Sequence, residues 1–259
     1  MSALVYMLAK DKICIATDTL SVYPDNKKPF KFVTKAFLLP HLKAIICGIG
    51  CLNLISEWFI FVQNQVVAQD LYYLDKISPE NLQKLYKKIE HHWGAVCSST
   101  IYHFGYIERE EKFVGFAYRS EHDFKSEQLI YSLGVKPGYK EVVDIAIDEI
   151  KNKGLPDAFV EIIKKLKSID DKLPVSERSG IGGEVHFFML TQKEMFCCVC
   201  YRFEDYDQVF ETMLELLLTK IIIPFLRGMF SRISTFNIFP TPRAGAVYDI
   251  TGGKKRNFI

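Results

Sequence analysis

The stretch SALVYMLAKDKICIATDT, residues 2–19, decides how this chain is expected to fold. Its two halves, 3–9 and 12–17, are apolar and rich in strand-forming side chains, and the charged pair Lys10 and Asp11 separates them. Two such runs around a short polar tip are typical of a β-hairpin. The chain is therefore predicted to open with two antiparallel strands, the second of which runs into Asp18.

Downstream of this hairpin, strand patterns alternate with helical patterns. The turn Gly48-Ile49-Gly50 leads into an apolar helical pattern, and Pro79 suits the first position of a second helix. Runs of strands between paired helices favour an α+β fold in which two sheets pack face to face under outer helices. Strands are predicted at 30–37, 44–47, 99–106, 112–118, 128–133, 184–190 and 195–202, and helices at 52–67, 78–92, 140–151, 157–167 and 206–230.

Length and composition favour one large core. The 259 residues are 49% hydrophobic, and no Pro/Gly/Ser-rich linker divides them. Single layered domains often reach about 250 residues. The prediction is a domain over 1–205, followed by a C-terminal helix and extended tail, 206–259, packed on the same domain.

Charge, hydropathy and cysteine content predict the compartment of the protein and argue against membrane and nucleic-acid partners. Thirty-three basic and thirty-one acidic residues give a net charge of +2, without the basic excess of nucleic-acid binders. The opening residues lack a signal-peptide pattern, and the apolar stretch 213–230 is interrupted by charged residues and Pro224. Seven cysteines, an odd number, are typical of free, buried thiols in a reducing compartment. We therefore expect a cytoplasmic protein with no membrane and no nucleic-acid partner.

Four short features, in this order and spacing, make the sequence resemble the proteasome β-subunit family of N-terminal-nucleophile (Ntn) hydrolases and its simpler bacterial relatives. The resemblance covers about residues 2–200 and implies a four-layer αββα sandwich of two mainly antiparallel sheets. The features are Ala16-Thr17-Asp18-Thr19, Lys35, Gly48-Ile49-Gly50 and Ile181-Gly182-Gly183.

The resemblance also implies a catalytic site. Counting back from Asp18 puts Ser2 at the nucleophile position, so that removal of Met1 frees the α-amine that serves as the base. Lys35 would lower the pKa of the Ser2 hydroxyl, Asp18 would orient Lys35, and the Gly50 N–H would face the substrate carbonyl oxygen. Lys31 is the alternative if the register slips.

The sequence departs from active family members near the late glycine pair. Arg178 and Ile181 stand where supporting aspartate and serine residues are expected, and the nearest serines, Ser179 and Ser132, are out of register. Two functions therefore stay open. The first is a hydrolase of peptide or amide bonds. The second is a catalytically inactive proteasome-like protein that acts as an assembly or partner-binding module, with the C-terminal helix as the contact of a homo-oligomer.

The remaining metal-type residues are interpreted as structural. Cys197, Cys198 and Cys200 lie on one predicted strand, where residues alternate between faces, and zinc sites need separated ligand pairs. Core packing is the preferred interpretation of these cysteines. The histidines show no spacing typical of ligands, so neither a metal nor a cofactor is expected.

Overall fold

The opening hairpin is present: β1 (Leu4–Leu8) and β2 (Ile13–Asp18) pair antiparallel, with Tyr6 opposite Ile15. This computed structural model describes residues 2–93 and 98–219. The chain divides into two compact units, Met1–Met213 and Leu214–Ile259, and all the described strands lie in the first.

Two five-stranded antiparallel sheets form this unit, together with a short ribbon of β3 and β4. The first sheet has the order β10-β1-β2-β11-β12, and the second has the order β5-β6-β7-β8-β9. The strands not yet given are β3 (Leu20–Val22), β4 (Pro29–Phe32), β5 (Ala36–Leu39), β6 (Ala44–Ile49), β7 (Thr100–Ile107), β8 (Lys112–Arg119), β9 (Ser126–Gln128), β10 (Ser132–Lys136), β11 (Glu184–Leu190) and β12 (Met195–Arg202).

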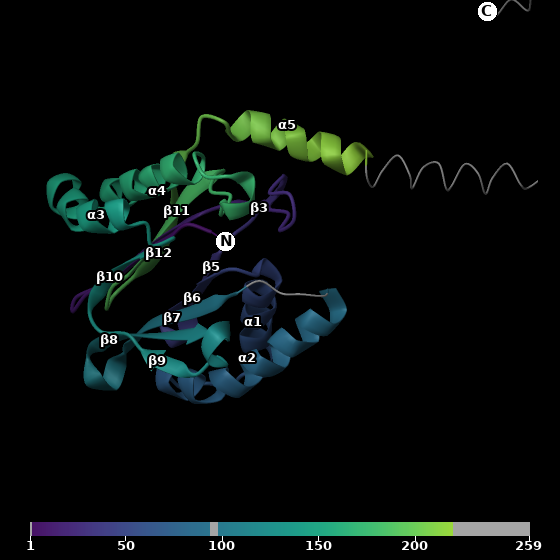
Figure 1. The fold of residues 1–259 in the computed structure, drawn as a ribbon. Coiled ribbons are helices and arrows are strands. Elements are labelled where there is room, and N and C mark those ends of the chain that lie inside the picture. Colours follow the sequence, from purple (N-terminus) through teal and green to yellow (C-terminus); the bar gives the residue numbers. More distant parts are fainter. Residues whose placement is uncertain (1, 94–97, 220–259) are drawn as a thin grey trace, which may run out of the picture. The chain divides into compact units, whose positions relative to one another are not determined.

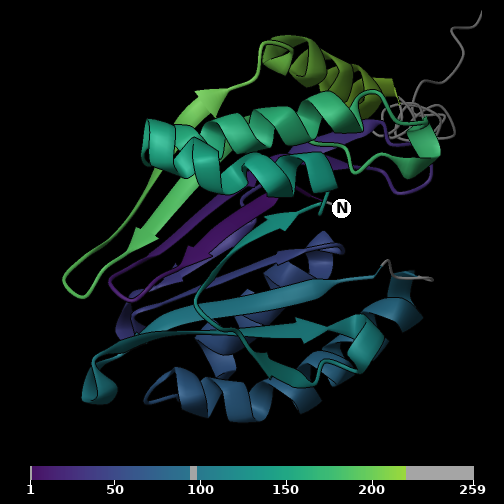
Figure 2. The ribbon, with the colours of Figure 1, turned by 60° about the vertical axis from the view of Figure 1, so that its left-hand side comes forward.

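Helices cover the outer face of each sheet (Figures 1 and 2). The pair α3 (Lys140–Lys153) and α4 (Asp157–Asp170) packs on the first sheet, and the pair α1 (Leu52–Gln65) and α2 (Leu71–Trp93) packs on the second. The apolar faces of the strands and helices therefore meet in two helix-to-sheet cores. The structure is α+β, as expected.

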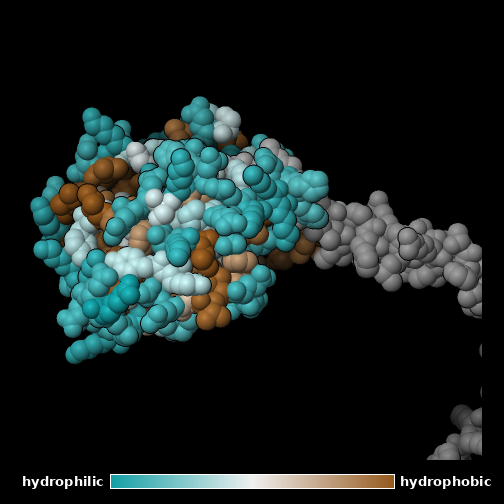
Figure 3. Space-filling model, turned by 90° about the horizontal axis from the view of Figure 1, so that it is seen from below, coloured by the Kyte–Doolittle hydropathy of each residue, from teal (hydrophilic) through white to brown (hydrophobic). Residues whose placement is uncertain are grey.

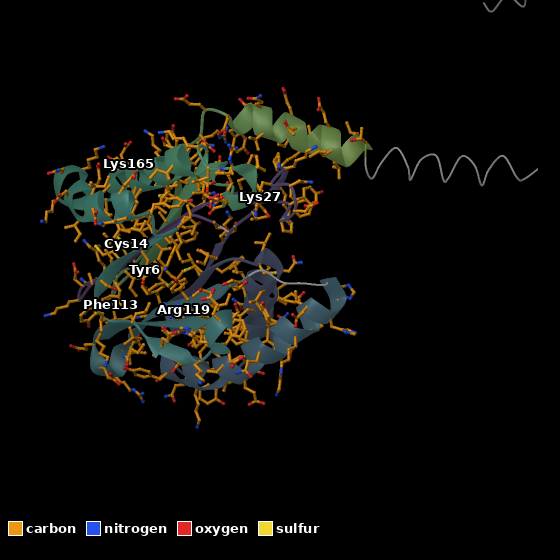
Figure 4. All side chains as sticks on the ribbon, in the orientation of Figure 1. Tyr6, Cys14, Lys27, Phe113, Arg119 and Lys165 are labelled. Carbon is orange, nitrogen blue, oxygen red and sulfur yellow. The ribbon has the colours of Figure 1, made fainter. Side chains whose placement is uncertain are left out.

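A third apolar cluster lies between the two sheets. It joins Tyr6 of β1 to Phe104 of β7 and Phe113 of β8, all of them buried. Successive residues of a strand point to opposite faces of the sheet. Cys14 of β2 therefore points away from the second sheet and packs in the core under α4. Figure 4 labels Cys14, which belongs to the core under α4, and Tyr6 and Phe113, which belong to the cluster between the sheets.

Three predicted elements, one helix and two strands, had wrong boundaries. The helix predicted to begin at Ser78 is part of a continuous α2, with Pro79 inside it. The start lies earlier because the Asp70 carboxylate accepts a hydrogen bond from the Tyr73 N–H (2.9 Å), as a helix cap does. Next to Pro79, the Ser78 hydroxyl donates to the Leu74 carbonyl one turn earlier in the same helix.

The strand predicted over 30–37 is two strands, β4 and β5, in different sheets. Residues 33–35 join them, and the Val33 N–H donates to the Thr19 carbonyl (2.8 Å), which ties this connection to the end of β2. The strand predicted over 128–133 is likewise divided between β9 and β10. Apolar residues also occur in both connections, so the hydrophobic pattern alone did not reveal them.

The last described helix is α5 (Tyr206–Leu217), which is the start of the helix predicted over 206–230. The rest of that prediction, from residue 220 on, lies outside the described residues, and the packing of 206–259 on the domain stays a prediction. No helix within the described ranges is long and apolar enough to cross a membrane. The face drawn in Figure 3 is largely hydrophilic, with separate hydrophobic patches.

His103 is a fully buried histidine in the core between α1 and the second sheet. Its Nε2 accepts a hydrogen bond from the Trp58 indole N–H (2.8 Å), and its ring stacks on that indole. Burial lowers the pKa of His103 to about 3. The native protein therefore keeps this imidazole neutral over a pH range in which the unfolded chain protonates it.

Acid is expected to destabilise the protein through His103. Between about pH 6.5 and pH 3 only the unfolded chain binds the proton, so His103 should lower the free energy of unfolding by about 1.4 kcal/mol per pH unit as the pH falls. Urea unfolding at several pH values measures this slope. His103→Gln should have a shallower slope than the wild type, whereas the exposed control His41→Gln should not; equal slopes in all three proteins would contradict the assignment.

Candidate active site

A single buried carboxylate, that of Asp18, collects contacts from three separate parts of the chain. Its Oδ1 accepts hydrogen bonds from the Ala3 N–H (2.9 Å) and from the Lys35 ammonium (2.7 Å). Its Oδ2 accepts one from the Gly182 N–H (3.1 Å). Asp18 is 0% exposed, so each of these bonds is made away from water. The first strand, the β4–β5 connection and the loop before β11 are therefore fastened at one point.

Lys35 reaches Asp18 because the chain leaves the β3–β4 ribbon just before it and enters the second sheet just after it. The ammonium is 2% exposed and also donates to the Leu20 carbonyl (2.6 Å). Burial lowers the pKa of Lys35, and the adjacent Asp18 carboxylate opposes that shift. Lys31, the alternative considered from the sequence, lies instead within the exposed ribbon strand β4, opposite Ser21.

Ser2 lies one residue from these contacts and is 7% exposed. Because the Ala3 N–H donates to Asp18, the backbone that carries Ser2 is held beside the Asp18–Lys35 pair. The structure thus brings Ser2, Asp18 and Lys35 into one region. Met1 lies outside the described residues, and the catalytic roles stay predictions.

The loop before β11 is organised by a residue that the sequence analysis missed, Asp170 at the end of α4. Its Oδ1 accepts bonds from the Ser179 N–H (2.7 Å) and the Tyr139 hydroxyl (3.0 Å), and its Oδ2 accepts one from the Gly180 N–H (2.9 Å). Asp170 is 1% exposed. This second buried carboxylate fixes the loop whose Gly182 then binds Asp18.

The same network affects Tyr139. Burial and the Asp170 carboxylate raise the pKa of Tyr139 to about 12. A sequence signal for Asp170 did exist: it continues the buried face of α4 four residues after Leu166 and eight after Ile162. A carboxylate on such a face needs buried partners.

Neither Arg178 nor Ile181 supplies a supporting carboxylate or serine. The Arg178 guanidinium donates to the backbone carbonyls of Leu173 (2.8 Å) and Asp171 (2.7 Å), and Ile181 packs in the core under α4. Ser132 pairs with Leu8, at the far end of β1. With about 3.4 Å per strand residue, that end lies about 20 Å from Ser2.

Gly50, the fourth predicted residue, ends β6 in the second sheet. Its φ is +100°, a conformation that side chains disfavour, and an added Cβ would lie 2.3 Å from the Ser98 carbonyl oxygen. Next to it the Cys51 N–H donates to the Ser99 hydroxyl (2.9 Å). The turn therefore requires glycine for structural reasons, and the role of its N–H toward a substrate stays a prediction.

Gly50→Ala should be strongly destabilising because it adds both backbone strain and a collision with the 98–99 backbone. Strain of this kind costs about 1 to 3 kcal/mol, and the collision adds to it. The matched control is Gly154→Ala, which also has a positive φ (+72°) but has no atom within 4 Å of an added Cβ. Chemical denaturation should show a clearly larger loss for Gly50→Ala; equal losses would mean that the collision is relieved at no cost.

The prediction that the late cysteines pack in the core was wrong for two of the three. Cys197 and Cys198 are exposed and Cys200 is half-buried, all as free thiols. The reason is the position of β12, which is the edge strand of the first sheet. An edge strand has a neighbour on one side only, so apolar side chains there are left partly uncovered.

Comparison with known proteins identifies the fold through solved structures. No protein-family model and no curated protein matches the chain. A Gly-1 mutant of Anbu from Hyphomicrobium sp. strain MC1 matches with a TM-score of 0.54 and 12% identity, over 90% of this chain and 100% of that one. The fold is proteasome-like. Anbu from Yersinia bercovieri, described as an ancestral beta-subunit, matches with the same TM-score and identity, over 93% of this chain and 100% of its own.

At 12% identity this likeness concerns the fold alone. It does confirm, at the level of the fold, the resemblance to proteasome β-subunits that the short motifs implied. A proteasome-like fold hosts more than one activity, so function must be argued from the residues of the site.

Proposed function

We propose that this protein is an Ntn hydrolase with the four-layer αββα fold, which cleaves amide or peptide bonds through Ser2 after Met1 is removed. One observation carries the proposal. The buried Asp18 carboxylate binds the Lys35 ammonium and, through Oδ1, the backbone N–H of Ala3, the residue that follows the nucleophile. A buried charge pair is costly unless every charge is compensated, and here it lies directly beside Ser2.

In the proposed reaction the free α-amine of Ser2 takes the proton of its own hydroxyl. The reference pKa of an α-amine, about 7.7 to 8.0, makes it a usable base near neutral pH. The oxygen attacks the amide carbonyl, the C–N bond breaks, and the leaving amine receives the proton from the α-ammonium. Water then cleaves the acyl ester and restores Ser2.

Lys35 and Asp18 act on this step by electrostatics. The positive charge of Lys35 stabilises negative charge on the Ser2 oxygen, and Asp18 keeps the ammonium oriented. Burial lowers the pKa of Lys35, and the Asp18 carboxylate opposes that shift and so favours the charged ammonium that this role requires. Asp170 is a positioning residue in this scheme, because it holds the loop from which Gly182 binds Asp18.

Removal of Met1 is the first condition to test. Intact-mass measurement of the protein expressed in cells should give a chain without Met1, and the same preparation should hydrolyse a panel of fluorogenic peptide and amide substrates. Ser2→Ala should lose this hydrolysis. A chain that retains Met1 would contradict the amine-assisted mechanism, since the nitrogen of Ser2 would then be an amide.

The arrangement around Arg178 and Ile181 favours a second candidate, a catalytically inactive assembly or partner-binding module. Neither residue supplies the polar support found in active relatives, as their contacts with backbone carbonyls and the apolar core indicate. In this case the protein forms a homo-oligomer in the cytoplasm through the helix that begins at Tyr206. Light scattering of the wild type and of Leu214→Glu/Leu217→Glu tests it: a smaller particle for the variant supports the assembly role, and equal masses contradict it.

A further inference from the structure

Cys198 and Cys200 hold two sulfur atoms 3.4 Å apart on the edge strand β12. Along a regular strand, residues two apart are separated by about 6.5 Å, so their sulfurs do not ordinarily meet. The strand is irregular here. Val185 of β11 lies opposite Tyr201, whereas the next residue, His186, lies opposite Val199. Cys200 is thus an extra residue in β12, and the resulting bulge bends the strand and brings the two thiols together.

The pair is accessible from solvent on the side of the first sheet that carries α4. Cys198 lies opposite Phe187, whose ring contacts Phe159 of α4. Cys198 is exposed and Cys200 half-buried. Cys197 is also exposed but lies opposite Phe188, which belongs to the cluster between the sheets, so its thiol faces the other way.

The distance between the two sulfurs would give a bound ion a narrow sulfur–ion–sulfur angle. With an ion–sulfur bond of about 2.3 Å, sulfurs 3.4 Å apart enclose an angle of about 95°. This angle is narrower than the tetrahedral angle at zinc and much narrower than the linear angle at two-coordinate copper(I). Zinc also takes four ligands, and the described residues contain no group of three His, Cys, Asp or Glu side chains placed to hold a metal. Trivalent arsenic, a soft and pyramidal centre, takes two thiol sulfurs at this angle.

The Cys200 thiol is better suited to condensation than to oxidation. Burial and the neighbouring Cys198 raise the pKa of Cys200 to about 12, so its thiol keeps its proton at neutral pH. Thiol oxidation and disulfide exchange proceed through the thiolate. Condensation with a trivalent arsenic hydroxide instead breaks two As–O bonds and two S–H bonds, forms two As–S bonds and releases two water molecules. No oxidant is needed, because the oxidation states do not change.

We propose that Cys198 and Cys200 form a two-thiol binding site for trivalent arsenic compounds, built by the bulge in β12. The site shares no residue with the Ser2, Asp18 and Lys35 region. The two can therefore be tested independently.

The test uses the full chain, reduced with a phosphine and treated with one equivalent of phenylarsine oxide. Intact mass should show one phenylarsenic group per chain, with the loss of one water. The adduct should survive a large excess of glutathione, a single thiol, and be removed by 2,3-dimercaptopropanol, a dithiol. Peptide mapping should place it on the segment that contains Cys198 and Cys200.

Cys198→Ser and Cys200→Ser should each retain at least tenfold less adduct after the glutathione challenge, because one thiol gives no chelate. The matched control Cys197→Ser removes an exposed thiol from the same strand and should behave as wild type. Circular dichroism checks that each variant folds, and if Cys200→Ser does not, Cys198→Ser decides alone. The proposal is overturned if the wild-type adduct is lost to glutathione, if it maps elsewhere, or if Cys198→Ser retains it.

Discussion

Asp18→Asn is expected to abolish hydrolysis and to lower the free energy of unfolding by about 3 to 5 kcal/mol. The substitution removes the negative charge but keeps the shape, so it leaves the Lys35 ammonium buried without a counter-charge. In the wild type the Ala3 and Gly182 N–H groups both donate to the carboxylate. In the variant, the asparagine NH2 group faces one of these N–H groups, so that two donors meet. Chemical denaturation measures the first effect and the substrate panel measures the second.

Two further variants separate charge from structure. Asp25→Asn, in the exposed loop before β4, is the control and should match the wild type in both assays. The double variant Asp18→Asn/Lys35→Met should recover part of the stability, because it also removes the unpaired charge, yet it should remain inactive. An active Asp18→Asn, or a double variant less stable than the single one, would contradict the role given to this pair.

Asp170→Asn is expected to have the second-largest effect. It weakens the three hydrogen bonds to this buried carboxylate and places the asparagine NH2 group against one of the loop N–H groups. The free energy of unfolding should fall by about 2 to 4 kcal/mol. The loop that carries Gly182 then loses its anchor. We expect a lower kcat with little change in KM for the best substrate of the panel, because Asp170 acts through Asp18 rather than on the substrate.

The next residue along the chain supplies the control for this variant. Asp171 is 51% exposed and pairs with Lys167 at the surface, so Asp171→Asn should change stability by less than about 1 kcal/mol and leave kcat unaltered. If Asp170→Asn lowered stability but not kcat, Asp170 would be structural only.

The sequence predicted the hairpin and the late strand pair well, because there the alternation of apolar residues and the polar turns coincide. Strands β11 and β12 begin and end where the pattern predicts. It predicted α2 poorly because Pro79, a usual helix starter, is tolerated inside this helix. Periodicity describes which side chains are buried, and it says little about where the backbone changes direction.

The residues of the candidate site also include some that the sequence indicated and one that it did not. The resemblance to proteasome β-subunits implied Asp18 and Lys35 as site residues, and the structure joins them at 2.7 Å. Asp170 was missed because its partners, Ser179, Gly180 and Tyr139, lie 9, 10 and 31 residues away and become neighbours only when α3, α4 and the loop are assembled. Its place on the buried face of α4 indicated burial, but the partners themselves depend on tertiary structure and leave no local motif.

Covalent labelling shows whether Ser2 is the nucleophile. The protein is treated with a serine-directed acylating or phosphonylating probe and digested, and the modified peptide is identified by mass spectrometry. We expect modification of Ser2 in a chain that lacks Met1 and no modification of Ser2→Ala. Labelling that persists in Ser2→Ala, or that maps to another residue, would contradict it.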